Sequence, residues 1–116
     1  EQAFSGTIAQ RALAEYYVDK AFISCRTVSI NNGITESTDQ WASIRYLMIE
    51  RSDKQYLVVD HTKFGQTSFV RICDFDEITA VITDHPLDAK WHEALRSKGC
   101  SVIDDDGETS IPELLG

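Results

Sequence analysis

The stretch that decides the fold is YLMIERSDKQYLVVDHTKFG, residues 46–65. It begins inside a predicted helix over 38–51 and continues into a predicted strand over 55–59. The strand is apolar through its centre, which is typical of a strand buried on both faces of a sheet. It ends abruptly in four polar residues, DHTK at 60–63. A helix that leads into a buried strand is the repeating unit of α/β proteins, so the sequence predicts that class.

The helix over 38–51 carries its own signals. Ser37 and Gln40 have capping-box spacing, which predicts where the helix starts. Apolar side chains recur at helical spacing and are expected to form its inner face, namely Trp41, Ile44, Leu47 and Met48.

The rest of the chain alternates between strands and helices. The expected elements are a helix over 7–17, a strand over 20–25, a loop over 26–36, strands over 68–73 and 78–83, a helix from Pro86 to a C-terminal Gly99, and a strand over 100–103. Apolar strands alternating with amphipathic helices imply a mainly parallel sheet covered on both faces. Because a crossover helix should follow a strand, we expect at least one further strand upstream.

Composition restricts the class of function. The 116 residues suit one domain, and 11 basic against 19 acidic side chains give a net charge of −8. Such a surface is a poor partner for a nucleic-acid backbone, so direct DNA contact is not expected. No apolar run is long enough to span a bilayer. Cys25, Cys73 and Cys100 form no C-x-x-C pair, which argues against a zinc or redox motif and suits free thiols in the cytosol.

Polar groups follow the predicted strands at the end where α/β sheets bind ligands. DHTK at 60–63 follows one strand, and the loops after Cys25 and at Asp84 follow two others. Lys63 can meet a phosphate or a carboxylate. Asp60 can accept hydrogen bonds from sugar hydroxyls or orient the lysine. A solvated loop would have the same composition, so this chemistry leaves a wet loop and a binding site equally open.

Several pieces in a fixed order resemble one family. AFSGTIAQRALAEYYVDKAFISC looks like a helix that runs into a "DKAF" strand, NNGIT looks like a G-[LI]-T loop, and ITAVITD looks like a strand ending in I-T-D. YLVVDHTKFG resembles a D-H-S-K-F-G signature, with Thr62 in place of the usual serine. From Ala3 to Ile103 the chain thus resembles the C-terminal effector-binding domain of the DeoR family of bacterial transcriptional repressors.

The resemblance implies a Rossmann-like, mainly parallel sheet flanked by helices, related to ribose-5-phosphate isomerase-type folds. It implies that a phosphorylated sugar modulates DNA binding by an N-terminal helix-turn-helix head, the only part that would touch DNA. That head, and the first strand with its phosphate loop, are expected before Glu1. We therefore expect 1–103 to be a sensor-domain fragment and 104–116 an acidic tail. A cytoplasmic homo-oligomer without a cofactor is also implied.

The resemblance assigns ligand-facing groups to two loops. They are Asp60, His61, Thr62 and Lys63, with Gly33 and Thr35 opposite them. Arg26 stands where an acidic residue is common, and is either a second phosphate contact or a solvated side chain. Ser24 and Thr27 stand where glycines are common, so this loop is expected to differ in shape or ligand preference.

Metal readings are disfavoured by the sequence. His85 and His92 are seven residues apart, but His85 precedes Pro86 and is expected outside the helix, so both are read as surface groups. Asp104 to Gly107 lacks the ligand spacing of a calcium loop. No metal site is expected.

Two other functions stay open. An aldose–ketose isomerase would need carboxylates that move a proton between neighbouring carbons. Asp60 is available for this, but no second acid–base group is evident, and Glu36 and Glu50 are weak candidates. The third reading is an oligomerisation module that binds no ligand.

Overall fold

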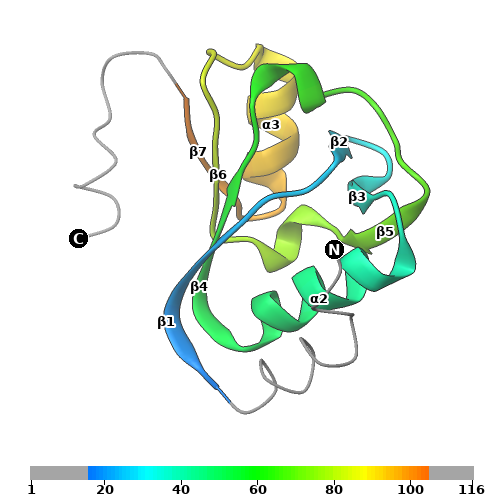
Figure 1. The fold of residues 1–116 in the computed structure, drawn as a ribbon. Helices are drawn as coiled ribbons and strands as arrows, with labels where there is room; N and C mark the ends of the chain where they lie inside the picture. Colours follow the sequence, from blue (N-terminus) through cyan, green and yellow to red (C-terminus); the bar gives the residue numbers. More distant parts are fainter. Residues whose placement is uncertain (1–15, 105–116) are drawn as a thin grey trace.

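The computed structural model describes residues 16–104 (Figure 1). Its elements are β1 (Val18–Ile23), β2 (Thr27–Ser29), β3 (Gly33–Glu36), α2 (Asp39–Glu50), β4 (Ser52–Val58), the 3-10 turn η1 (His61–Lys63), β5 (Val70–Cys73), the 3-10 turn η2 (Phe75–Glu77), β6 (Ala80–Ile82), α3 (Ala89–Ser97) and β7 (Ser101–Ile103). The helix expected over 7–17 lies outside the described residues except for its last two positions.

Four strands form a parallel sheet in the order β1-β4-β6-β7. The register pairs Phe22 with Tyr56, Tyr56 with Ala80, and Ala80 with Ser101. These are the strands expected around 20–25, 55–59, 78–83 and 100–103, so the predicted α/β class and mainly parallel sheet are confirmed.

A second, antiparallel sheet of β2, β3 and β5 corrects one expectation. Residues 26–36 were expected to form a loop, but they form a hairpin in which Val28 pairs with Ile34. Asn31 and Asn32 mark only its turn, and Gly33 follows with a positive φ of 77°. Strands of three and four residues carry too little periodicity to be recognised in the sequence.

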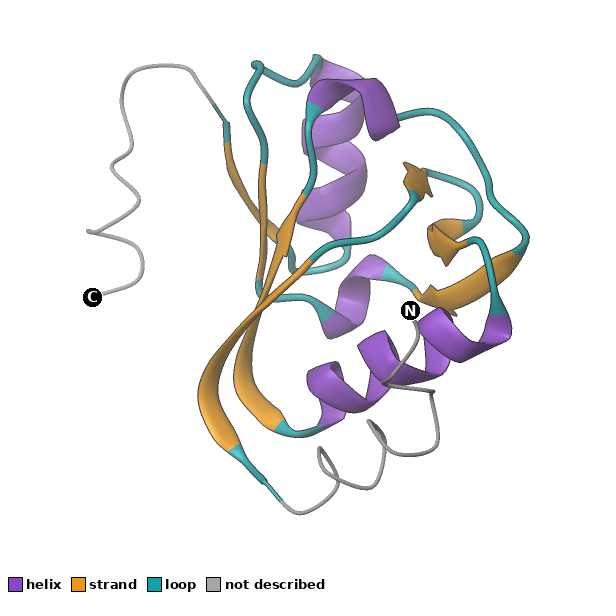
Figure 2. Ribbon diagram, viewed as in Figure 1, coloured by secondary structure: helices purple, strands orange, loops and turns teal. Residues whose placement is uncertain are grey.

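The described helices pack on one face of the parallel sheet. Figure 2 shows α2, α3 and the small sheet on the same side of the four strands. The chain steps through β1, β4, β6 and β7 in one direction, and crossovers of one hand then place every connection on the same face. Cover on both faces was expected, but within 16–104 only this face carries helices. The other face exposes Phe22 and Val58.

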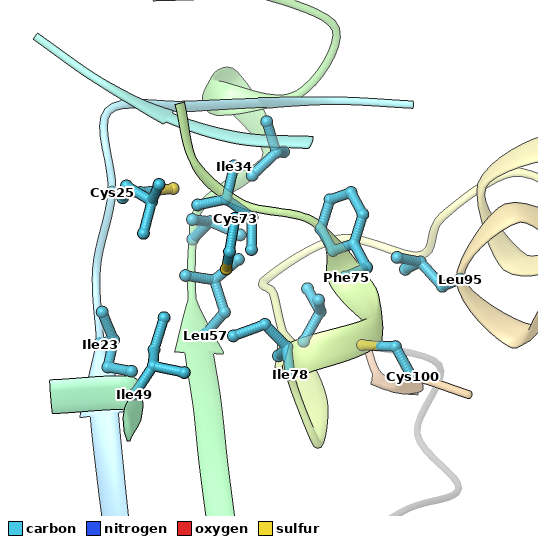
Figure 3. Packing of buried hydrophobic residues seen from close by; sticks show 14 of the residues in the cluster. Ile23, Cys25, Ile34, Ile49, Leu57, Cys73, Phe75, Ile78, Leu95 and Cys100 are labelled. Carbon is cyan, nitrogen blue, oxygen red and sulfur yellow. The ribbon is translucent and has the colours of Figure 1, made fainter. Parts of the chain in front are cut away.

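The hydrophobic core lies between the parallel sheet and these elements (Figure 3). Ile23 and Leu57 point from the sheet toward Ile49 of α2, while Leu95 enters from α3. Leu57 and Leu95 have no exposed surface. The expected burial of the strand over 55–59 is confirmed for Leu57 and Tyr56, which face opposite sides of the sheet.

The three cysteines are free, as predicted, and all three are buried. Burial raises the pKa of each thiol to about 12, with the negative charge of Glu36 adding to the effect at Cys25. Neutral, buried thiols behave as small apolar side chains.

The helix boundaries differ in detail from those predicted. Thr38, not Ser37, caps α2, and its hydroxyl accepts a hydrogen bond from the Trp41 amide at 3.2 Å. Trp41 is 45% exposed under the Arg45 guanidinium, and Ala42 and Ile49 form the buried face instead. α2 packs against β5 and β3 as well as against β1 and β4, so its buried face differs from the one that helical spacing alone indicates.

The second helix also starts later than predicted. Asp88 caps α3 by accepting from the Trp91 amide at 2.9 Å, so Pro86 lies before the helix. Gly99 follows the C-cap with a φ of 77°, as predicted. Asp104, expected to begin the acidic tail, is buried and accepts hydrogen bonds from the Leu87 amide and the His92 ring.

Candidate ligand site at the carboxyl edge of the parallel sheet

The DHTK residues form a closed turn at the end of β4. Asp60 caps η1, accepting hydrogen bonds from the Thr62 amide at 2.9 Å and from the Thr62 hydroxyl. These two bonds, and more weakly the Lys63 charge, hold the pKa of Asp60 below its ordinary value. The Lys63 amide donates to the Asp60 carbonyl at 3.1 Å. The turn is therefore fixed by its own hydrogen bonds.

The turn is fixed to the hairpin and to α3. Phe64 forms a parallel bridge with Val28, and the Gly65 amide donates to the Val28 carbonyl at 2.8 Å. The Phe64 ring meets the Trp91 ring edge-on, with centroids 4.9 Å apart. These contacts set the position of the polar groups that precede Phe64.

His61 joins the turn to the loop after the neighbouring strand. Its amide donates to Asp84 Oδ1 at 2.7 Å, and its Nδ1 lies 3.0 Å from Asp84 Oδ2. The His61 side-chain bond is the main reason why the pKa of Asp84 lies far below its ordinary range. The His85 Nδ1 lies 3.2 Å from the same Oδ2, and its ring centroid is 3.9 Å from that of His61.

Sequence reasoning missed this cluster of His61, Asp84 and His85. It compared His85 with His92, which instead pairs with the buried Asp104 at 3.0 Å. A signal was present, since His61 follows β4 and Asp84 follows β6 in the sequence. Only the knowledge that β4 and β6 are neighbours brings the two loops together.

Two cationic side chains occupy this edge of the sheet. Lys63 is half-buried, and its ammonium has no hydrogen bond or ion pair among residues 16–104. Arg26 follows β1 and is exposed, and its guanidinium likewise has no such partner in the described part of the chain. Its backbone amide donates to the Thr35 carbonyl at 3.2 Å. Both cations are therefore free to meet an anion.

Gly33 and Thr35 lie inside the hairpin. Thr35 is 2% exposed, and its hydroxyl bonds the Thr27 hydroxyl at 2.7 Å and the Ser68 amide at 2.8 Å. A Cβ at Gly33 would lie 2.7 Å from the Cys73 carbonyl oxygen, so glycine is required for packing there. The structure thus brings residues 60–63 together on one exposed edge, while these two residues support the neighbouring hairpin.

A hollow of about 300 Å³ adjoins the turn on the side of Gly65. Its lining combines the hairpin turn with the start of α3, and consists of Ser29, Ile30, Asn31, Asn32, Gly65, Thr67, Lys90 and Trp91. None of these residues was predicted as a contact, because they meet only once the hairpin has formed.

The fold and this edge define a class, namely an α/β domain with polar and cationic groups at the carboxyl ends of its parallel strands. The sequence matches the DeoR C terminal sensor domain family over residues 1–85. The chain belongs to this family, as the resemblance predicted. No helix among residues 16–104 is long and apolar enough to cross a membrane.

Three relatives show in which kinds of protein a similar sequence occurs. The chain is 36% identical over 100 residues to an uncharacterised HTH-type transcriptional regulator, YulB, of Bacillus subtilis, covering 86% of this chain and 39% of the relative. It is 32% identical to the HTH-type transcriptional regulator GlpR of Haloferax volcanii, covering 89% and 40%. It is 33% identical to a lactose phosphotransferase system repressor of Staphylococcus aureus, covering 77% and 35%.

The chain spans about two fifths of the length of the first two of these relatives. All three are transcriptional regulators by name, so the comparisons give the isomerase reading no support.

Proposed function

We propose that this domain senses a phosphorylated sugar for a transcriptional repressor of sugar metabolism. The observation that carries the proposal is Lys63, a half-buried cation without a hydrogen bond or ion pair in residues 16–104, held in a hydrogen-bonded turn at the carboxyl edge. A phosphate dianion supplies what this ammonium lacks. The names of two relatives, a lactose phosphotransferase system repressor and an L-fucose operon activator, support a role in sugar metabolism.

The ligand would meet different groups at its two ends. Lys63 would bind the phosphate, with Arg26 as a second contact, while His61, Thr62 and Asp60 would meet sugar hydroxyls. Gly33 and Thr35 would act indirectly, because they shape the hairpin that borders the turn. An effector shifts the DNA affinity only to the extent that it binds one conformation better than the other. The DNA-binding head would lie outside this chain, since the domain itself carries a net charge of −8.

Two further properties belong to this proposal. We place the regulator in the cytoplasm, where three free thiols are stable. We also propose that it self-associates. Among the described residues the outer edge of β1 pairs with no strand, and Phe22 and Val58 beside it are about half exposed.

Calorimetric titration tests the ligand. The full-length protein that carries this chain is titrated with pentose and hexose phosphates, with the matching free sugars, and with inorganic phosphate. We expect binding of at least one sugar phosphate and much weaker binding of its free sugar. Lys63→Met should weaken that binding by about tenfold or more, because a charge-assisted hydrogen bond is lost.

Lys54→Met is the matched control, since Lys54 is an exposed lysine nearer the amino end of β4 and away from the turn. It should bind like the wild type. If no sugar phosphate binds, the proposal fails and the oligomerisation module becomes the better reading. If both lysine variants lose affinity equally, the assignment of Lys63 as the phosphate contact fails.

A further inference from the structure

We propose that His61, Asp84 and His85 bind a divalent first-row transition-metal ion of the Zn²⁺ type. The three side chains converge from the loops after β4 and β6. One ligand atom from each, two imidazole nitrogens and a carboxylate oxygen, lies within 4.8 Å of the others. The cluster shares His61 with the proposed sugar site, but it requires no sugar phosphate, so the metal site can be tested separately from the proposed sensing role.

The spacing of the donor atoms suits a small cation. Zinc binds imidazole nitrogen and carboxylate oxygen at about 2.0–2.2 Å, which places two ligands of a tetrahedral site about 3.3–3.4 Å apart. The Nδ1 atoms of His61 and His85 lie 3.0 and 3.2 Å from the same oxygen, Asp84 Oδ2. Both distances are therefore close to the ligand spacing of a tetrahedral zinc site.

The carboxylate is already oriented for this role. Its other oxygen, Oδ1, accepts the His61 amide at 2.7 Å and the Thr83 hydroxyl at 3.4 Å. These bonds turn Oδ2 toward the two imidazoles. Hydrogen bonds from neighbouring groups that orient a metal-binding side chain in this way are a general feature of metal sites.

The donor set selects a class of metal. Two imidazoles and one carboxylate suit Zn²⁺, Co²⁺, Ni²⁺ or Cu²⁺, whereas Mg²⁺ and Ca²⁺ prefer oxygen ligands alone. The side chains of His61, Asp84 and His85 are 51%, 48% and 58% exposed, so an ion can enter from solvent. Three protein ligands leave at least one coordination position open, as in exchangeable rather than structural sites.

The second histidine–carboxylate pair of the domain shows the contrast. His92 Nε2 lies 3.0 Å from Asp104 Oδ2, but that oxygen also accepts the Leu87 amide at 2.9 Å. No third ligand joins this pair within the described part of the chain. His92 is therefore a matched control for His85.

The test uses tag-free, chelator-treated protein titrated with Zn²⁺ by calorimetry and with Co²⁺ by visible absorption. We expect one ion per chain and a d–d spectrum of nitrogen and oxygen ligation. His85→Ala should weaken Zn²⁺ binding at least tenfold, and Asp84→Asn should do the same, while His92→Ala should leave it unchanged. Circular dichroism verifies that each variant remains folded.

The inference is overturned if wild-type protein binds no ion, or if His85→Ala and His92→Ala bind Zn²⁺ equally well. In that case the three residues form only a surface ion-pair cluster. Lys63→Met separates the two proposals, since it should impair sugar-phosphate binding and leave Zn²⁺ binding intact. His85→Ala should show the reverse pattern, so each proposal can fail while the other holds.

Discussion

The Glu36 carboxylate, with a side chain only 6% exposed, accepts a hydrogen bond from Arg45 Nε at 2.9 Å and so joins β3 to α2. Its second oxygen accepts the Ser37 amide at 3.0 Å. Both oxygens of this carboxylate, which the sequence makes a weak candidate for a base in sugar chemistry, are thus occupied in holding the small sheet against the helix. Glu36 is a structural residue.

Removing this carboxylate should destabilise the domain. Glu36→Ala leaves Arg45 without its partner at a largely buried position, and we expect a loss of about 3 kcal/mol in the free energy of unfolding. Urea denaturation followed by circular dichroism measures it. Glu50→Ala, at an exposed position on the same helix, should stay within about 0.5 kcal/mol of wild type. Equal losses in the two variants would contradict the assignment.

The Thr35 hydroxyl should matter for stability and not as a ligand contact. Thr35→Val keeps the shape of the side chain but leaves the Ser68 amide without its acceptor. An unsatisfied buried donor costs about 1–3 kcal/mol. Thermal or urea denaturation should show this loss, while the affinity for any sugar phosphate found by titration should change less than with Lys63→Met. A loss of affinity without a loss of stability would show that Thr35 contacts the ligand directly.

How far the sequence determined these features depended on the length of each pattern. β4 and α2 were recognisable because a run of apolar residues marks the centre of the strand, and capping signals with apolar residues at helical spacing mark the helix. β2 and β3 were not, because these short strands are held by pairing, β2 with β3 and β3 with β5, and not by a pattern of their own. The unrecognised sheet also explains the position of Trp41, which helical spacing alone assigned to the core.

The candidate site was half predictable for a similar reason. Residues 60–63 form one continuous turn, and their placement after a buried strand indicates the correct edge of the sheet. The contact of His61 with Asp84 depends on the spatial order of β4 and β6, which no local pattern encodes. Thr35 shows the opposite case, since its place in the G-I-T segment gave no sign that its hydroxyl would be buried.

The thiols should be unreactive in the folded protein. Burial raises the pKa of Cys25, Cys73 and Cys100 to about 12, so almost no thiolate exists at pH 8. Ellman's reagent should label none of the three rapidly until denaturant is added, and all of them afterwards. Ser43→Cys, at an exposed position of α2, provides the positive control and should react at once. Rapid labelling of the native wild type would contradict the burial of these side chains.

The ion pair between Asp74 and Lys98 should make stability depend on pH. Lys98 Nζ lies 2.8 Å from Asp74 Oδ2, and the Phe75 amide donates to Oδ1 at 2.7 Å. Burial alone would raise the pKa of Asp74, but these hydrogen bonds outweigh it and hold the pKa below its ordinary value. The folded state therefore binds this proton less readily than the unfolded state. The resulting stabilisation is fully present above the unfolded pKa of about 3.9 and is lost as the pH falls through the lower folded value.

Asp74→Asn isolates this charge, because its side-chain oxygen can still accept from the Phe75 amide and cap η2. We expect the variant to be less stable than wild type at pH 7, by about 1 kcal/mol for a pair at the domain surface. The difference should persist down to about pH 4 and shrink below it, as the wild-type carboxyl becomes protonated. Urea denaturation of both proteins between pH 7 and pH 3 measures this trend, with Asp76→Asn as an exposed control on the same turn. A difference that grows as the pH falls would have the opposite sign and would show that Asp74 is not stabilised in its charged form.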